Sequence, residues 1–474
     1  AIATREAHAR EESPALAADL NALATIASRT GRSDEAETGY LRALAIRERV
    51  LGPQHPDVAT TLAGLAILNQ DRGDGARAEA LARRALGVRE LALGPDHRDV
   101  ARSLHELATM VDGTGRSDEA ETLYRRALSI RTRWHGPDSP EVDQTSMRLA
   151  ALLRARGELA EARDLYARVV VARRRALGDD DPAVAEAMHE LGRTKRLAGD
   201  QEDAERDLVA ALRIRKLALD PHDVRIAETS REVGLVLLAR GSADEAAEAL
   251  EIAHVGLERA RGADSEAAGG ALTDLALART AQGRTDDAKA LFERAVSLRG
   301  LQTNEPRMLV ALDGLAEVLR ARGELIEACA ALERALEIRE RGNDRSGIAS
   351  TLVRLGAARR ELRQHTEAER LLRRSVDLRR AISGFDDLEV ADALEELGTV
   401  YRADWRLAEA EELYLHVLEI REQALGPTHP SVAPTLRHLE RTYLALGRHG
   451  EADRFQRRAA GIAHETAVSG AVKP

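Results

Sequence analysis

The chain has 474 residues, of which 44% are hydrophobic, 32% are charged and only 2% are aromatic, and its formal net charge is −10. This composition excludes a disordered chain, and the acidic balance argues against a general binder of nucleic-acid backbones. The one cysteine, Cys329, excludes an intramolecular disulfide and a cysteine-based zinc site, and no apolar run reaches the roughly 18 residues of a membrane helix.

An internal repeat organises the sequence. The seven residues GRSDEAE that start at Gly31 return unchanged at Gly115, 84 residues later. A marker position recurs in steps of 42 residues, with two steps of 40. The eleven markers are Gly31, Gly73, Gly115, Gly157, Gly199, Gly241, Gly283, Gly323, Arg363, Trp405 and Gly447. Such a period predicts a repeat protein in which every repeat packs on its neighbours.

Each repeat is predicted to be a helical hairpin. Apolar residues at spacings of three and four give two stripes, and the marker between them suits a turn in the left-handed conformation. Small residues occupy two fixed columns, one seven residues before the marker and one five residues after it, which allows the two helices to approach closely. The second column is alanine in all eleven repeats, so we expect Ala120, Ala162 and Ala204 to be almost fully buried.

A capping residue is expected before each first helix. The candidates are Ser13, His55, His97, Ser139, Asp181, Asp223, Ser265, Glu305, Arg345, Asp387 and His429. This repeated position explains the loop histidines better than a metal site does.

The predicted order along the chain follows from the markers. Residues 1–12 align with the end of a second helix, so we expect them to belong to a truncated preceding repeat. Residues 13–264 form repeats one to six, 265–344 form the shorter and divergent repeats seven and eight, and 345–465 form repeats nine to eleven with a C-terminal cap. A flexible tail is expected over 466–474. The shortened repeats favour a kink between about 256 and 348, with ordinary repeat drift as the alternative.

Two recurring segments of the sequence resemble those of a known family. LGPQHPDVA at residues 51–59 and YRRALSIR at residues 124–131 are similar to the inter-repeat loop and second helix of the tetratricopeptide repeat, in the 42-residue form of kinesin light chain and many bacterial proteins. The resemblance implies an all-α, right-handed α-solenoid of about eleven hairpins. It also implies that the first helix of each hairpin lines a concave groove.

No catalytic motif stands out. The chain has no phosphate-binding loop, and His105-Glu106 and His189-Glu190 begin like the zinc motif H-E-x-x-H without a second histidine at the required place. We therefore expect no catalytic residue, no cofactor and no metal site. Cys329 is interpreted as a partly exposed thiol with no identifiable base beside it.

An arginine recurs near the end of the second helix in nine repeats: Arg47, Arg89, Arg131, Arg173, Arg215, Arg299, Arg339, Arg379 and Arg421. We interpret this column as structural, because a cation at a helix C-terminus is favoured by the helix dipole. Nucleic-acid contact is the alternative.

The expected groove wall is one stripe per first helix. In repeat four the stripe contains Gln144, Met147, Ala151 and Arg154. The candidate partner-binding residues are Arg148, Arg154, His189, Arg193, Arg196, Arg231, Asp392, Glu395 and Glu396. They predict a basic wall over repeats four to six and an acidic wall in repeat ten, so the partner would carry the opposite charges. For each residue, a merely solvated surface is the alternative.

The sequence therefore predicts a non-enzymatic, cytoplasmic scaffold that binds a protein or peptide in a charged groove, without nucleic acid or membrane as partner. The alternative is the sensor or regulatory arm of a larger bacterial signalling or defence protein, fused to a Ser/Thr kinase, a STAND NTPase or a CHAT protease. RNA binding is disfavoured by the net charge and by the scarcity of aromatic residues for stacking.

Overall fold

The computed structural model describes residues 13–302, 305–384 and 387–470. Within these ranges the chain forms 23 helices and no strand. It divides into two compact halves, Ala1–Pro221 and His222–Pro474. The predictions for residues 1–12 and for 471–474 fall outside the described residues.

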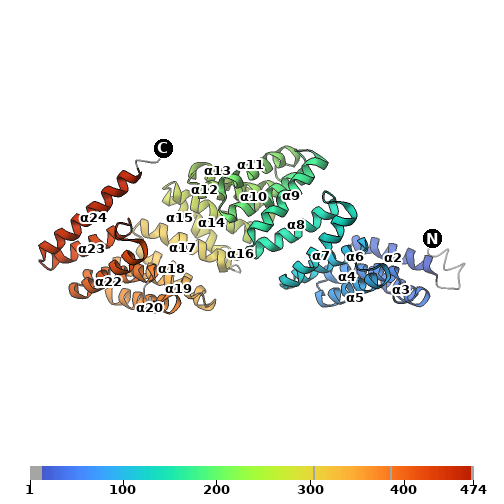
Figure 1. The fold of residues 1–474 in the computed structure, drawn as a ribbon, viewed down its shortest axis with the longest axis horizontal. Coiled ribbons are helices and arrows are strands. Elements are labelled where there is room, and N and C mark those ends of the chain that lie inside the picture. Colours follow the sequence, from blue (N-terminus) through green and yellow to red (C-terminus); the bar gives the residue numbers. More distant parts are fainter. Residues whose placement is uncertain (1–12, 303–304, 385–386, 471–474) are drawn as a thin grey trace. The chain divides into compact units, whose positions relative to one another are not determined.

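The N-terminal half contains five antiparallel helical hairpins, which follow one another along the chain (Figure 1). Their helices are α2 (Pro14–Arg29), α3 (Ser33–Leu51), α4 (Pro56–Asp71), α5 (Gly75–Leu93), α6 (Arg98–Asp112), α7 (Ser117–His135), α8 (Pro140–Ala155), α9 (Leu159–Leu177), α10 (Pro182–Ala198) and α11 (Gln201–Ala218).

The C-terminal half contains six further hairpins and one extra short helix, α16. Its helices are α12 (Val224–Ala239), α13 (Ala243–Arg261), α14 (Glu266–Ala281), α15 (Thr285–Ser297), α16 (Arg299–Gln302), α17 (Glu305–Ala321), α18 (Leu325–Arg341), α19 (Arg345–Glu361), α20 (His365–Ser383), α21 (Leu388–Ala403), α22 (Leu407–Leu425), α23 (Val432–Ala445) and α24 (His449–Gly470).

The marker positions are the turns of the hairpins, as predicted. All eleven have a positive φ, between 61° at Trp405 and 90° at Gly199. Nine of them are glycine, which adopts this conformation without a Cβ clash. The eleven expected hairpins are therefore confirmed in the described part of the chain.

The two small-residue columns lie where the helices of a hairpin meet. Every alanine of the second column is at most 1% exposed, and Ala120, Ala162 and Ala204 are completely buried. In the first column a Cβ added to Gly192 would lie 2.6 Å from Cγ of Leu208. The columns thus set the distance between the paired helices.

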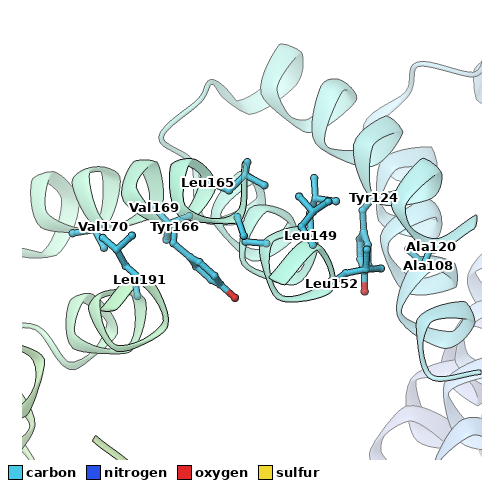
Figure 2. Close-up of a cluster of buried hydrophobic side chains, with 14 of the residues drawn as sticks. Ala108, Ala120, Tyr124, Leu149, Leu152, Leu165, Tyr166, Val169, Val170 and Leu191 are labelled. Atoms are coloured by element: carbon cyan, nitrogen blue, oxygen red, sulfur yellow. The ribbon is translucent and has the colours of Figure 1, made fainter. Parts of the chain in front are cut away.

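Larger apolar side chains fill the space between successive hairpins. Figure 2 shows part of this core in the N-terminal half, where side chains from α6 to α10 pack together. Tyr124 and Tyr166 are among the largest fully buried residues. A hairpin therefore completes its core only with its neighbours.

The recurring arginines link one hairpin to the next, and our explanation from the helix dipole is wrong. Nη1 of Arg131, at the end of α7, donates to the carbonyl of Glu141 at 2.8 Å and to Oγ1 of Thr145 at 2.7 Å, both on α8. Arg47 makes the equivalent bonds to the carbonyl of Asp57 and to Thr61, each at 2.7 Å. We call this arrangement the arginine latch. The arginine column is therefore structural, as expected, but each arginine stabilises the contact with the following helix and not the end of its own helix.

The latch recurs beyond these two repeats. Equivalent hydrogen bonds to the start of the next first helix are made by Arg89, Arg173, Arg339, Arg379 and Arg421. A guanidinium suits the task because the two N–H groups of its Nη1 can donate to two acceptors at once.

Most of the predicted helix caps are confirmed by hydrogen bonds from the backbone to their side chains. They are Ser13, His55, His97, Ser139, Asp181, Asp223, Ser265 and Asp387.

Three of the expected caps differ from the prediction. Glu305 and Arg345 are the first residues of α17 and α19, and Asp344 caps α19 by accepting from the backbone N–H of Gly347 at 3.0 Å. Nδ1 of His429 accepts from the backbone N–H of Ser431 at 3.2 Å, before α23 begins.

Repeat seven departs most from the pattern. Its second helix, α15, ends at Ser297, and α16 follows within the region where we expected a kink. The backbone N–H of Gly300 donates to the carbonyl of Asp264 at 3.0 Å, and a Cβ at Gly300 would lie 2.3 Å from the backbone nitrogen of Glu266. Only glycine allows α16 to lie this close to the loop before α14.

One smaller prediction is wrong. Cys329 is buried on α18 rather than partly exposed, and burial raises the pKa of its thiol. Helix α24 extends to Gly470, into the segment 466–474 for which we expect a flexible tail.

Candidate functional site

A pocket of about 580 Å³ lies between the first helices of repeats four and five, α8 and α10, with α9 as its floor. All four residues of the predicted stripe on α8 line it, together with Arg148 from the neighbouring position. The remaining lining residues are Asp138, Pro140, Asp143, Tyr166, Arg173, Ala176, Leu177, Ala183, Glu186 and Glu190. We call this the wall pocket.

One departure from the repeat pattern at this site is an acid within a column of alanines. Fourteen residues before the marker most repeats have a buried alanine, such as Ala101 and Ala185, but repeat four has Asp143. Burial raises the pKa of the Asp143 carboxyl, and the charge of Arg173 opposes this shift. Nε of Arg173 lies 3.7 Å from Oδ2 of Asp143.

The latch arginine of repeat four is also unusual. Several other latches end on a hydroxyl, such as Thr61 or Thr145, but the equivalent residue of α10 is Ala187. Nη1 of Arg173 donates to the carbonyl of Ala183 at 2.6 Å and to Oε2 of Glu186 at 2.8 Å. Arg173 is therefore shared between the joint of two hairpins and the wall pocket.

Two predicted site residues, Arg154 and His189, lie next to Glu190, which lines the pocket. Arg154 forms an ion pair with Glu190, and its guanidinium lies 5.6 Å from the centre of the Tyr166 ring. Burial opposes ionisation of Glu190, but the charges of Arg154, His189 and Arg193 outweigh it and lower the pKa of this carboxyl. His189 itself is buried, with Nε2 4.0 Å from Oε1 of Glu190.

Arg148 differs from the other arginines of the pocket. It is exposed, and it makes no ion pair or hydrogen bond with any residue that the structure describes. The pKa of His105 is lowered to about 4, mainly by burial, then by the charge of Arg131 and last by the charge of Arg148. Arg148 is therefore a cation that can pair with an external anion.

The structure does not bring every predicted basic residue into this pocket. Arg193 and Arg196 are half-buried on α10 outside its lining. Arg231 belongs to the C-terminal half, where its Nε lies 2.5 Å from Oδ2 of Asp274.

The predicted acids of repeat ten contact arginines. Arg421 donates to Oδ1 of Asp392 and Oε1 of Glu395, each at 2.8 Å. Oε2 of Glu396 lies 3.7 Å from Nε of Arg360, and burial raises the pKa of this carboxyl. Part of the acidic charge of this wall is thus neutralised within the protein.

A second pocket, of about 450 Å³, occupies the equivalent place between α17 and α19 in the C-terminal half. Its floor includes Leu332, at the repeat position of Tyr166. Arg354 lines it but forms an ion pair with Asp313 at 2.7 Å. A hollow between first helices therefore occurs in both halves, but the two hollows differ in their polar groups.

Neither a metal site nor a membrane span is found in the described ranges. No group of three or more His, Cys, Asp or Glu residues is placed to hold a metal ion. None of the helices there has the length and apolar character needed to cross a bilayer.

Sequence reasoning missed Asp143, Tyr166 and Arg173 as site residues. A signal was present at Asp143, which stands in a column that is alanine in most repeats. This column was not recognised from the sequence, and a pocket that opens onto it cannot be seen from periodicity alone.

Comparison with known proteins is consistent with this architecture. The tetratricopeptide repeat profile matches residues 15–90, 65–133, 141–216, 225–299, 307–381 and 389–464. No match was found among curated proteins.

Solved structures with similarity include BtubC (BKLC) from P. vanneervenii, with 24% identity, a TM-score of 0.41, and coverage of 48% of this chain and 91% of that chain. They also include the apo form of the quorum sensor NprR from B. thuringiensis, with 11% identity, a TM-score of 0.55, and coverage of 77% and 99%. At these identities the likeness concerns the fold alone.

Proposed function

This chain belongs to the tetratricopeptide repeat family, whose architecture supports a protein-interaction scaffold, and we propose that it is a non-enzymatic scaffold that binds a partner segment along its first-helix wall. The observation that carries this proposal is the wall pocket. Residues from α8 and α10, which belong to different hairpins, line one open hollow there. Such a preformed hollow reduces the ordering cost of binding.

The charges of the wall suggest what the partner carries. Arg148, Arg154, Arg193 and Arg196 belong to repeats four and five, so an acidic stretch of the partner would lie there. In the C-terminal half, taken by itself, Arg231 would meet an acidic group of a partner, and Asp392, Glu395 and Glu396 would meet a basic stretch. Complementary charge of this kind accelerates association more than it raises affinity.

The test uses the natural partner, captured by crosslinking and identified by mass spectrometry. The double variant Arg193→Glu, Arg196→Glu should lower the association rate constant about tenfold, and high salt should lower that of the parent protein similarly. The control is Arg206→Glu, Arg213→Glu, which reverses two exposed charges on α11, a second helix. This control should change the rate little.

Binding that is indifferent both to the wall reversal and to salt contradicts the proposal. An equal effect of the two double variants also contradicts it, because it would show that net charge matters and the wall does not.

A further inference from the structure

We propose that the wall pocket binds an acidic side chain of the partner, whose carboxylate accepts hydrogen bonds from the Tyr166 hydroxyl and from Arg148. The inference rests on the proposed function and names the chemistry of one subsite on that wall. Four observations support it: the hydrogen bonds of the repeat tyrosines, the state of the other polar groups, the apolar lining and the contrast with the second pocket.

The Tyr166 hydroxyl is the exception among equivalent tyrosines. Tyr40, Tyr124 and Tyr414 occupy the same repeat position, and their hydroxyls lie 3.0–3.1 Å from the hydroxyl of a threonine fifteen residues earlier. These threonines are Thr25, Thr109 and Thr399. In repeat four that residue is Ala151, and the Tyr166 hydroxyl makes no hydrogen bond with a described residue.

The placement of Tyr166 makes this unused hydroxyl available to a ligand. The residue is only 1% exposed, and its ring lies within the core while its oxygen points out of the cluster (Figure 2). Burial raises the pKa of this phenol, so it keeps its proton and can donate. Because Tyr166 lines the wall pocket, a molecule bound there can accept a hydrogen bond from this hydroxyl.

The other polar groups of the pocket decide the charge of that molecule. All four lining carboxylates contact arginines: Asp138 pairs with Arg175, Asp143 and Glu186 with Arg173, and Glu190 with Arg154. Arg148 has no such partner among the described residues. The lining groups without such a contact are therefore the Arg148 guanidinium, the Tyr166 hydroxyl and the amide N–H2 of Gln144, whose Oε1 already accepts from Arg131 at 3.2 Å. All three are donors, which match a carboxylate better than a basic side chain.

The rest of the lining matches the stem of an acidic side chain. Met147, Ala151, Ala176 and Leu177 give the pocket an apolar surface beside the two donors. The methylene groups of a glutamate can pack there while its carboxylate reaches Tyr166. We therefore assign the carboxylate to a side chain within the segment rather than to a chain end.

The second pocket provides the internal contrast. Leu332 replaces the tyrosine there, and Arg354 is already paired with Asp313. That pocket offers neither free donor, so the preference for a carboxylate distinguishes the wall pocket from the second pocket.

The experiment uses the full chain and pools of short peptides with acetylated and amidated ends. The pools share random flanks and differ in one fixed central residue, which is Glu, Gln or Lys. The parent protein should retain the Glu pool about tenfold more than the Gln pool, because a hydrogen bond to a charged acceptor is stronger than one to a neutral amide. Tyr166→Phe and Arg148→Ala should each remove most of this preference.

Two further variants separate binding from folding. Tyr124→Phe removes a phenol that is already bonded to Thr109, so it should leave the Glu preference intact. Ala151→Thr should give Tyr166 the internal partner that the other tyrosines have. It should therefore weaken the Glu preference while leaving the unfolding midpoint equal to that of the parent or higher.

Each outcome is informative. Retention of no pool contradicts both this inference and the proposed function. Retention that is indifferent to the central residue, to Tyr166→Phe or to Ala151→Thr contradicts the subsite alone. A free-acid pool with Gln at the centre that binds as well as the Glu pool would show that a chain end is the ligand, which also contradicts the inference.

Discussion

Single methyl groups set the spacing of the paired helices. The alanine column five residues after each marker is buried in all eleven repeats, and Ala204 on α11 is completely inaccessible to solvent. Its neighbour across the hairpin is Gly192 on α10, where even one added carbon would meet Leu208. The seam therefore has no room for a larger side chain.

Replacing Ala204 with leucine should overpack this seam and lower the free energy of unfolding by about 1–3 kcal/mol. Denaturant midpoints measure the change. Val209→Leu, on the exposed side of the same helix, serves as the control and should change the midpoint little. Equal midpoints for Ala204→Leu and the parent would show that the column is not a packing device.

A buried histidine makes stability depend on pH. His105 on α6 is 7% exposed and packs edge-on against Tyr124, and its pKa is lowered to about 4 by burial and by the nearby arginines. An unfolded chain protonates histidine near pH 6.5. Between these values the unfolded state binds more protons, so the free energy of unfolding falls as the pH falls from about 6.5 to about 4.

The variants His105→Gln and His105→Phe should remove part of this acid sensitivity, up to about 3 kcal/mol at pH 4. Urea midpoints at pH 7.5 and pH 4.5 give the comparison, because the difference between the two midpoints should shrink in both variants. A difference as large as in the parent would mean that His105 is already charged in the folded protein.

At the scale of the helix, the arginine latch joins elements that belong to different repeats. The latch from Arg131 uses a main-chain carbonyl and a threonine of α8, and the arginine itself is only 6% exposed. Removal of the guanidinium would leave buried acceptors without a donor, which costs more than the hydrogen bonds contribute.

Arg131→Lys keeps the charge but replaces the planar guanidinium that fixes Nη1 with an ammonium on a shorter and more flexible stem, so it should lower the free energy of unfolding by about 1–3 kcal/mol. Hydrogen exchange should show the loss at the C-terminus of α7 and the N-terminus of α8. The control Arg133→Lys changes an exposed arginine on the same helix that pairs with Asp96. Equal exchange in both variants would contradict the latch.

The turn of repeat ten carries an avoidable strain. Trp405 has a φ of 61° where nine other repeats have glycine, and its side chain is 77% exposed. Trp405→Gly should therefore raise the free energy of unfolding by about 1 kcal/mol, since it relieves a left-handed backbone while losing little burial. Thermal unfolding checks this, and a lowered midpoint would mean that the indole contributes more than its exposure indicates.

The fold was largely predictable because helix periodicity, markers and small-residue columns are local or strictly repeated signals. The end of α15 at Ser297 was not predictable, because it depends on the contact of Gly300 with a loop more than thirty residues earlier in the chain. The latch was seen as a column but explained wrongly, because its acceptors lie on the next helix. For the site, the α8 stripe was predicted, whereas the free hydroxyl of Tyr166 depends on what residue stands at Ala151 across the hairpin.

At the scale of the whole molecule, the hairpins share no single core. The buried clusters run from one hairpin to the next, and separate clusters occur in each half. In such a chain a local change alters the stability of nearby repeats, while distant repeats are little affected.

Ala410→Leu on α22 should therefore lower hydrogen-exchange protection in α21 to α23 and leave α2 to α9 unchanged. The variant Ala204→Leu is the matched change in the other half and should leave α20 to α23 unchanged. A uniform loss of protection over the described helices in either variant would show that the chain unfolds as one cooperative body.

The latch has a consequence for how such a protein diversifies. Because the arginines of repeats one, three and four bind a main-chain carbonyl in the neighbouring helix, that part of each joint does not depend on which side chains the helix presents outward. Mutations on the wall can then accumulate in one hairpin without loosening its junctions. Duplication of a 42-residue segment would carry its own latch with it, so new specificity can be gained one repeat at a time during evolution.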